Sequence, residues 1–216
     1  MPFDFEFAKS ILPHLLEASL ITIKATFVSF AIALVAGLFL ALGLRSRLAL
    51  VRRVIWGATQ FIRSTPLLVQ LYFLFFVLPE FGITMTPFLT GVIGLGVHYS
   101  CYIAEVYRAG LDSVPKGQWE AAVALNYGRS RAMTEIILPQ AIPPMVPVLA
   151  NYMITMFKDT PVMASITVIE LMQTANIIAS ERFLYVEPMT IVGLIFLALS
   201  LIASLGVRVI EWRLTR

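Results

Sequence analysis

The stretch EAAVALNYG, Glu120 to Gly128, is a hydrophilic segment between two strongly apolar parts of the chain, and it continues to Ile136-Ile137-Leu138-Pro139 before apolar sequence resumes. A membrane protein that needed only a connection at this place would use a few turn residues. The chain instead devotes about thirty residues, 111–140, to two short helices with their own start and stop signals. This pattern predicts that the 111–140 loop lies outside the membrane and is held by another protein.

The composition places the chain among integral membrane proteins. Of 216 residues, 59% are hydrophobic and 13% are charged, whereas soluble domains have about 25% charged residues. Because a helix needs about twenty apolar residues to cross the hydrocarbon, the length allows about five or six crossings and leaves no room for a soluble catalytic domain. The single Cys101 and the distant His14 and His98 predict neither a disulfide nor a metal site. The net charge of +3 comes from loop arginines, so no nucleic-acid partner is expected.

Apolar runs predict an all-α membrane protein with about five spans in a single domain, 1–216. The expected spans are 15–44, 54–78, 87–107, 141–157 and 188–209. The start, Met1 to Glu6, lacks the basic residues of a cleaved signal peptide, so the first apolar segment is expected to remain as a membrane helix. Segment 160–187 is broken by Pro161 and carries Glu170, so we expect a short re-entrant or half-crossing piece followed by an outer loop.

Basic residues set the predicted orientation, because positive side chains near the ends of spans stay in the cytoplasm. They form three groups on one side of the predicted spans: Arg45, Arg47, Arg52 and Arg53 in the first loop, Arg108, Lys116, Arg129 and Arg131 around the large loop, and Arg208, Arg213 and Arg216 at the end. The N-terminus is therefore predicted to lie outside and the C-terminus in the cytoplasm.

The first helix of the 111–140 loop is predicted from Lys116 to Leu125. Ser113-Val114-Pro115 has the form of a helix start, since proline is tolerated in the first helical turn. Trp119, Ala122 and Val123 fall at helical spacing and form an apolar stripe.

The second helix of this loop is predicted from Ser130 to Ile137, stopping before Pro139. Asn126 and Gly128 lie between the two helices, and both can take the left-handed conformation that ends a helix. An amphipathic loop lying on the lipid headgroups would give a similar pattern.

The motifs of this loop resemble the EAA loop of ABC importer permeases. They are Glu120-Ala121-Ala122, the ten-residue step from position 126 to Ile136, and Leu138-Pro139-Gln140-Ala141. Further segments resemble the polar amino acid (histidine, glutamine, glutamate, arginine, opine) permease family over nearly the whole chain: Arg63-Ser64-Thr65-Pro66-Leu67-Leu68-Val69-Gln70, Tyr102-Ile103-Ala104-Glu105-Val106, Ser113 to Trp119, and Lys158-Asp159-Thr160. One position departs from the family, because Asn126 stands where glycine is usual; asparagine is the next best residue for a left-handed cap.

The resemblance implies a type I ABC importer permease fold in a bacterial inner membrane. The implied partners are a cytoplasmic ABC ATPase dimer, a second permease chain that makes a homodimer or a heterodimer, an external or periplasmic solute-binding protein, and a small polar solute. The permease itself would have no catalytic site and no cofactor, with ATP and Mg bound by the ATPase. The residues implied in ATPase coupling are Gly117, Glu120, Ala121, Ala122, Asn126 and Gly128.

Polar residues inside the predicted spans indicate a passage, since charges in the bilayer tend to face protein or a cavity. A zwitterionic solute needs both signs of charge and hydrogen-bond donors, and the candidates are Arg63, Thr65, Asn151, Lys158, Asp159 and Thr160. The same groups could serve to hold helices together.

Two other function classes are compatible with part of the sequence. An ion-driven secondary transporter or a channel would explain buried charges in five spans but needs no two-helix loop with EAA spacing. An intramembrane enzyme could use His98, Cys101 and Glu105, which share one helix face, but a third supporting group is missing.

Overall fold

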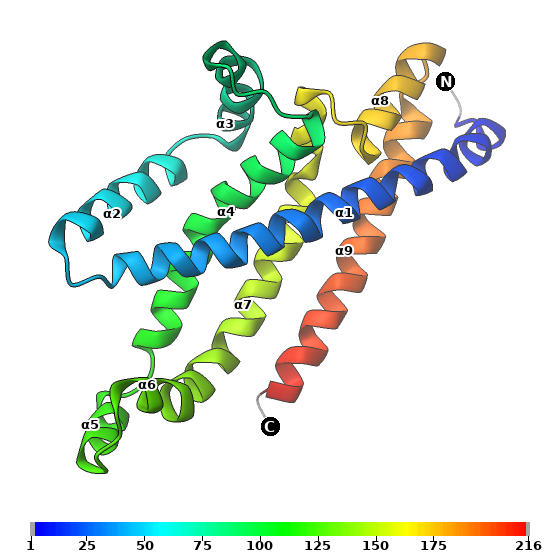
Figure 1. Ribbon diagram of the computed structural model, residues 1–216. Coiled ribbons are helices and arrows are strands. Elements are labelled where there is room, and N and C mark those ends of the chain that lie inside the picture. The colour runs from blue at the N-terminus through cyan, green and yellow to red at the C-terminus, as the bar shows by residue number, and fades with distance from the viewer. Residues whose placement is uncertain (1–2, 215–216) are drawn as a thin grey trace.

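The computed structural model describes residues 3–214, and this part of the chain is helical with no β-strand (Figure 1). The expectations that involve Met1, Pro2 and Arg216 lie outside the described residues. The helices in chain order are α1 (Phe5–Leu44), α2 (Ala49–Arg63), α3 (Leu67–Tyr72), the π-helix η1 (Phe73–Val77), the 3-10 helix η2 (Leu78–Phe81), α4 (Pro87–Asp112), α5 (Lys116–Ala124), α6 (Arg129–Ala132), the π-helix η3 (Met133–Ile137), α7 (Leu138–Asp159), the 3-10 helix η4 (Thr160–Ile166), α8 (Leu171–Arg182) and α9 (Val186–Leu214).

The expected number of spans agrees with this architecture. Within the described residues, four helical segments are long and apolar enough to cross a membrane: α1, α4, the continuous segment Arg129–Ile166, and α9. The bent pair α2–α3 brings the number to five if it is one broken span. The all-α class with about five spans is thereby confirmed.

Helix α1 begins ten residues before the expected start at residue 15. The carboxylate of Asp4 accepts a hydrogen bond from the Phe7 N–H at 3.0 Å and caps the helix, and Glu6 lies in the positive first turn. The helix then runs through Pro13 without ending. At 40 residues it is about 60 Å long, so it exceeds the thickness of a bilayer unless it is tilted.

The centre of the molecule is the crossing of α1 and α4, where small residues allow close approach. A Cβ built on Gly96 would lie 2.6 Å from Cγ2 of Ile32, and one on Gly37 would lie 2.8 Å from Cγ2 of Ile103. Both glycines therefore permit a helix distance that a larger side chain would prevent.

The expected second span, 54–78, is divided in its middle. The chain bends by 104° between α2 and the helical segment that begins with α3. The residues between them, Ser64 to Pro66, are called the elbow here. Pro66 has no N–H to donate to the Ile62 carbonyl, and Gln70 replaces it: its Nε2 lies 2.7 Å from Ile62 O, 3.1 Å from Thr65 O and 2.7 Å from Thr65 Oγ1. The expected second span therefore has a sharp corner at Pro66.

The sequence predicts that the second helix of the 111–140 loop stops before Pro139. It instead continues through η3 into α7. Proline in a helix clashes with the preceding turn. A π turn is wider than an α-helical turn, and η3 ends two residues before Pro139, which makes room for the ring. The π-helix η1 likewise ends two residues before Pro79.

Segment 160–187 forms a bend followed by a short helix. Thr167 takes a left-handed conformation with φ 65°, and α8 follows with 12 residues, about 18 Å. The fully buried Glu170 caps α8 by accepting the Gln173 N–H at 2.9 Å, and it accepts the Thr22 hydroxyl at 3.2 Å. These bonds fix α8 to α1.

Candidate functional site

Two regions of the structure contain the predicted coupling residues and two of the predicted passage residues. The first is the 111–140 loop, which Figure 1 places at one end of the molecule, with α3 and α8 toward the other end. The second is a group of polar and aromatic side chains on α2, α4 and α7.

Helix α5 forms where predicted and ends at the predicted left-handed residue. Asn126 takes the left-handed conformation with φ 58°. Its N–H donates to Val123 O and the Tyr127 N–H donates to Ala122 O, both at 2.9 Å. These two bonds are the pair expected of a Schellman motif, so asparagine retains the turn that glycine normally makes. Gly128, at φ −64°, is not needed for it.

The apolar stripe expected on α5 is divided between two faces. Ala122 is 1% exposed and Trp119 packs against the cluster around Val114 and Ile137, so both face the chain itself. Val123 and Leu125 are 74% and 69% exposed. Both side chains are therefore available for contact with another protein.

The outer side of the loop also carries charge. A hollow of about 640 Å³ is lined by Glu120, Lys116, Arg129, Arg45 and Val123, among other residues. Glu120 and Ala121 are exposed, as a contact with another protein requires. A Cβ at Gly117 or Gly128 would meet no atom within 4 Å, so packing inside the chain does not explain these two glycines.

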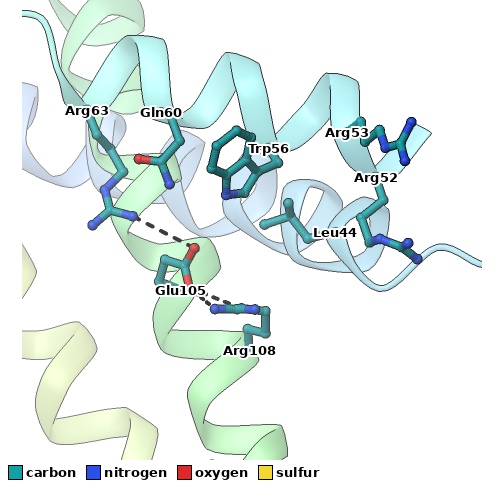
Figure 2. Close-up of a pocket in the computed structure, with 8 residues that line it drawn as sticks. All are labelled: Leu44, Arg52, Arg53, Trp56, Gln60, Arg63, Glu105 and Arg108. Atoms are coloured by element: carbon teal, nitrogen blue, oxygen red, sulfur yellow. Dashed lines mark hydrogen bonds and ion pairs between the residues drawn. The ribbon is translucent and has the colours of Figure 1, made fainter. Parts of the chain in front are cut away.

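Arg63, at the end of α2, is held loosely. Its Nη1 lies 3.8 Å from Oε1 of Glu105, and its guanidinium carbon lies 5.1 Å from the ring centre of Tyr102 (Figure 2). Glu105 is bound more closely by Arg108, at 2.8 Å. Within residues 3–214, no group accepts a hydrogen bond from the Arg63 guanidinium, so its five donors are available.

A cluster of three tyrosines connects Arg63 to α7. The ring centres of Tyr99 and Tyr102 are 6.0 Å apart, those of Tyr102 and Tyr152 are 5.9 Å apart, and those of Tyr99 and Tyr152 are 6.2 Å apart. The Tyr99 hydroxyl donates a hydrogen bond to the Asp159 carboxylate. Arg63 and Asp159 therefore contact different members of one tyrosine cluster, which the sequence alone did not indicate.

The other four predicted passage residues do not join the tyrosine cluster. Thr65 lies at the elbow, where its hydroxyl donates to backbone carbonyls of α2 and accepts from Gln70. Asn151 and Lys158 are exposed on α7. Thr160 is buried and donates to Phe157 O at 2.7 Å.

On the helix face considered for an intramembrane enzyme, His98 and Cys101 bond to groups other than each other. Nδ1 of His98 lies 3.1 Å from Oε1 of Gln70, and Cys101 is buried with its sulfur 3.6 Å from Val97 O. His98 and Cys101 do not form the hydrogen bond of a nucleophile and its base. Among the described residues, no three His, Cys, Asp or Glu side chains are grouped so as to hold a metal ion.

Comparisons with known proteins all match membrane components of transport systems. Residues 33–216 match the family model of the binding-protein-dependent transport system inner membrane component. The chain is 44% identical to the probable amino-acid ABC transporter permease protein y4tG of Sinorhizobium fredii, over 99% of this chain and 92% of that protein. It is 34% identical to the arginine transport system permease protein ArtQ of Bacillus subtilis, over 99% of this chain and 98% of that protein.

Solved structures show the same similarity. A crystal structure of an amino acid ABC transporter with histidines superposes with a TM-score of 0.93 at 35% identity, covering 99% of this chain and 100% of the other. The MetNI methionine ABC transporter in an inward-facing conformation has a TM-score of 0.73 at 20% identity, covering 94% of each chain, which shows a shared fold.

Proposed function

Because the chain belongs to the binding-protein-dependent transport system inner membrane component family and is a permease subunit of the amino-acid ABC transporter class, we propose that it carries a polar amino acid or a related zwitterionic solute through the tyrosine cluster. As a permease it has no catalytic site and binds no cofactor of its own. ATP and Mg belong to a separate ATPase in this proposal.

The observation that carries the proposal is the Arg63 guanidinium beside the tyrosine cluster, which donates no hydrogen bond within residues 3–214 and lies 3.8 Å from Glu105. A guanidinium with unused donors binds a carboxylate through two parallel hydrogen bonds. Tyrosine faces attract an ammonium group, and the Asp159 carboxylate, bound to Tyr99, adds negative charge on the other side of the cluster. One side of the cluster therefore suits a carboxylate and the other an ammonium group, which together fit a zwitterionic solute.

The coupling role is proposed for the outer face of the 111–140 loop. Glu120 and Ala121 would contact a groove of a cytoplasmic ABC ATPase dimer, together with the exposed Val123 and Leu125. Gly117, Ala122, Asn126 and Gly128 would shape the loop. Closure of the ATPases on ATP would then move the attached helices and shift the population between inward-open and outward-open states.

The remaining parts of the assembly follow from the same proposal. A second permease chain, identical or related, would complete the passage, and an external solute-binding protein would deliver the solute. The multi-pass chain lies in the inner membrane, with the N-terminus outside and the C-terminus in the cytoplasm in the proposed orientation. Asn151, Lys158 and Thr160 are proposed as further passage residues.

The test is uptake by the assembled transporter in proteoliposomes, with radiolabelled arginine, histidine and glutamine supplied separately. Arg63→Gln is expected to lower uptake by about tenfold to a hundredfold, the effect of losing a charged hydrogen bond of about 1.5–3 kcal/mol, while basal ATP hydrolysis continues. Arg208→Gln, which changes an exposed arginine of α9, serves as the control. Full uptake by Arg63→Gln, or uptake that continues without ATP, contradicts the proposal.

A further inference from the structure

One face of α2 carries a row of polar and aromatic side chains, of which the proposed passage uses only Arg63. Arg52 and Arg53, Trp56, Gln60 and Arg63 follow one another in helical steps of three or four, so they share a face. With Glu105 and Arg108 of α4 they line a cavity of about 560 Å³, and Figure 2 shows these side chains around it. This cavity is called the arginine cavity below.

The arginine cavity has a net positive charge, because its lining residues include more arginines than carboxylates. Four arginines and one carboxylate line it, and Arg63 and Arg108 share that carboxylate, Glu105. Arg52 donates to Ser46 O at 3.3 Å, a neutral partner. Within the described chain, no carboxylate forms an ion pair with Arg52 or Arg53. Arginines that only held helices together would be expected to pair with carboxylates, and Arg52 and Arg53 do not.

The position of the arginine cavity relates it to the passage. Arg63 belongs to the cavity and also contacts Tyr102 of the tyrosine cluster. From Arg63 the cavity follows α2 back to Arg53, ten residues or about 15 Å along the helix, near the turn between α1 and α2. Arg52, Arg53 and Arg108 are exposed, so this end of the cavity is open to solvent and contains water or an anion.

We propose that the arginine cavity is a water-filled anion site that receives the solute's carboxylate as it leaves Arg63 for the aqueous phase at the α1–α2 turn. The identity of the ligand rests on the proposed function, whereas the water filling and the preference for anions rest on the geometry alone. Positive charge lining a cavity raises the local concentration of anions. Arg52, Arg53 and Arg108 would then hold a carboxylate that Arg63 has released.

The test labels single introduced thiols in the assembled transporter with methanethiosulfonates of opposite charge. Cys101→Ala removes the native thiol, and Gln60→Cys places a thiol in the cavity, with Trp56→Cys as a second position. Ala58→Cys, exposed on the opposite face of the same helix, is the matched control. Rates for the sulfonatoethyl and the trimethylammonioethyl reagents are each divided by the rate with free 2-mercaptoethanol.

We expect the thiol introduced by Gln60→Cys to favour the anionic reagent by at least about tenfold. The joint change Arg52→Gln and Arg53→Gln is expected to abolish this preference, and the control thiol of Ala58→Cys to show none. The transported amino acid is expected to slow the labelling of the Gln60→Cys variant more than inorganic phosphate does at equal concentration. No labelling of the Gln60→Cys and Trp56→Cys variants, or equal rates for the two reagents, overturns the anion site.

The two proposals can fail separately. If the unaltered transporter takes up its amino acid but that amino acid does not slow labelling, the cavity lies off the solute's route, and the inference fails while the proposed function stands. If the unaltered transporter takes up no amino acid yet the Gln60→Cys variant favours the anionic reagent, the proposed solute is wrong and the anion site remains.

Discussion

Gln70 is the residue whose replacement tests the elbow most directly. Its amide nitrogen serves the carbonyls of Ile62 and Thr65 and the Thr65 hydroxyl, and its oxygen faces Nδ1 of His98. Since the nitrogen faces the carbonyls, Nδ1 of His98 must carry the proton that reaches the Gln70 oxygen. Gln70→Met keeps a side chain of similar size but removes both donors and the acceptor.

The expected cost follows from counting the bonds. Two N–H donors and the His98 bond are lost, and each contributes about 1 kcal/mol, so the free energy of unfolding should fall by about 3 kcal/mol. At about 2–4 °C per kcal/mol for a chain of this size, the melting temperature should drop by about 6–12 °C. Thermal unfolding in nanodiscs, followed by tryptophan fluorescence, measures this drop, and Gln173→Met on α8 is the matched control.

The same variant should loosen the angle between α2 and α3. Spin labels at Ala58 and Phe81, both exposed, report the distance across the 104° bend. We expect a broader distance distribution with Gln70→Met than with the original glutamine. A melting temperature within about 2 °C of the control, the shift that a loss of less than about 1 kcal/mol would give, together with an unchanged distribution, would show that the elbow is fixed by other contacts.

Three further changes test other parts of the structure. Ala121→Trp on the exposed face of α5 is expected to reduce ATP-driven uptake and copurification of the ATPase by at least about tenfold, equivalent to about 1.4 kcal/mol; retention of both contradicts the proposed contact. Gly96→Ala should lower stability by about 1–3 kcal/mol, because the new Cβ would lie 2.6 Å from a side-chain carbon of α1, whereas Gly193→Ala has open space; equal melting temperatures for the two would refute this. Thr22→Val should cost about 1–3 kcal/mol by removing the hydroxyl partner of Glu170, and an unchanged melting temperature would assign the position of α8 to apolar packing.

Features set by a few neighbouring residues could be predicted from the sequence. The start of α5 after Pro115 and its end at Asn126 depend on local backbone preferences, and the structure has both. The corner at Pro66 follows from the missing N–H of proline. The 104° angle did not follow, because it depends on Gln70 and on its contact with α4.

Features set by distant residues could not be predicted. Tyr99 and Tyr102 are three apart on one helix, a pattern that is visible in the sequence, but their contact with Tyr152 needs the packing of α4 against α7. The burial of Ala122 depends on how the loop folds back on itself. The continuity through Pro139 depends on a π turn, which apolar periodicity does not indicate.

The arrangement of the helices suggests where motion of the loop would be felt. Both helices that carry the tyrosine cluster connect directly to the 111–140 loop: α4 enters it, and α7 leaves it through the unbroken segment from Arg129 to Asp159. The glycine contacts hold α4 against α1, so a pull on the loop displaces α7 more readily than α4. The Tyr99–Asp159 hydrogen bond joins α4 to α7, and such a displacement would open it. A force applied at α5 would thus change the distance between two sides of the tyrosine cluster, the proposed passage, without requiring any bend in α4.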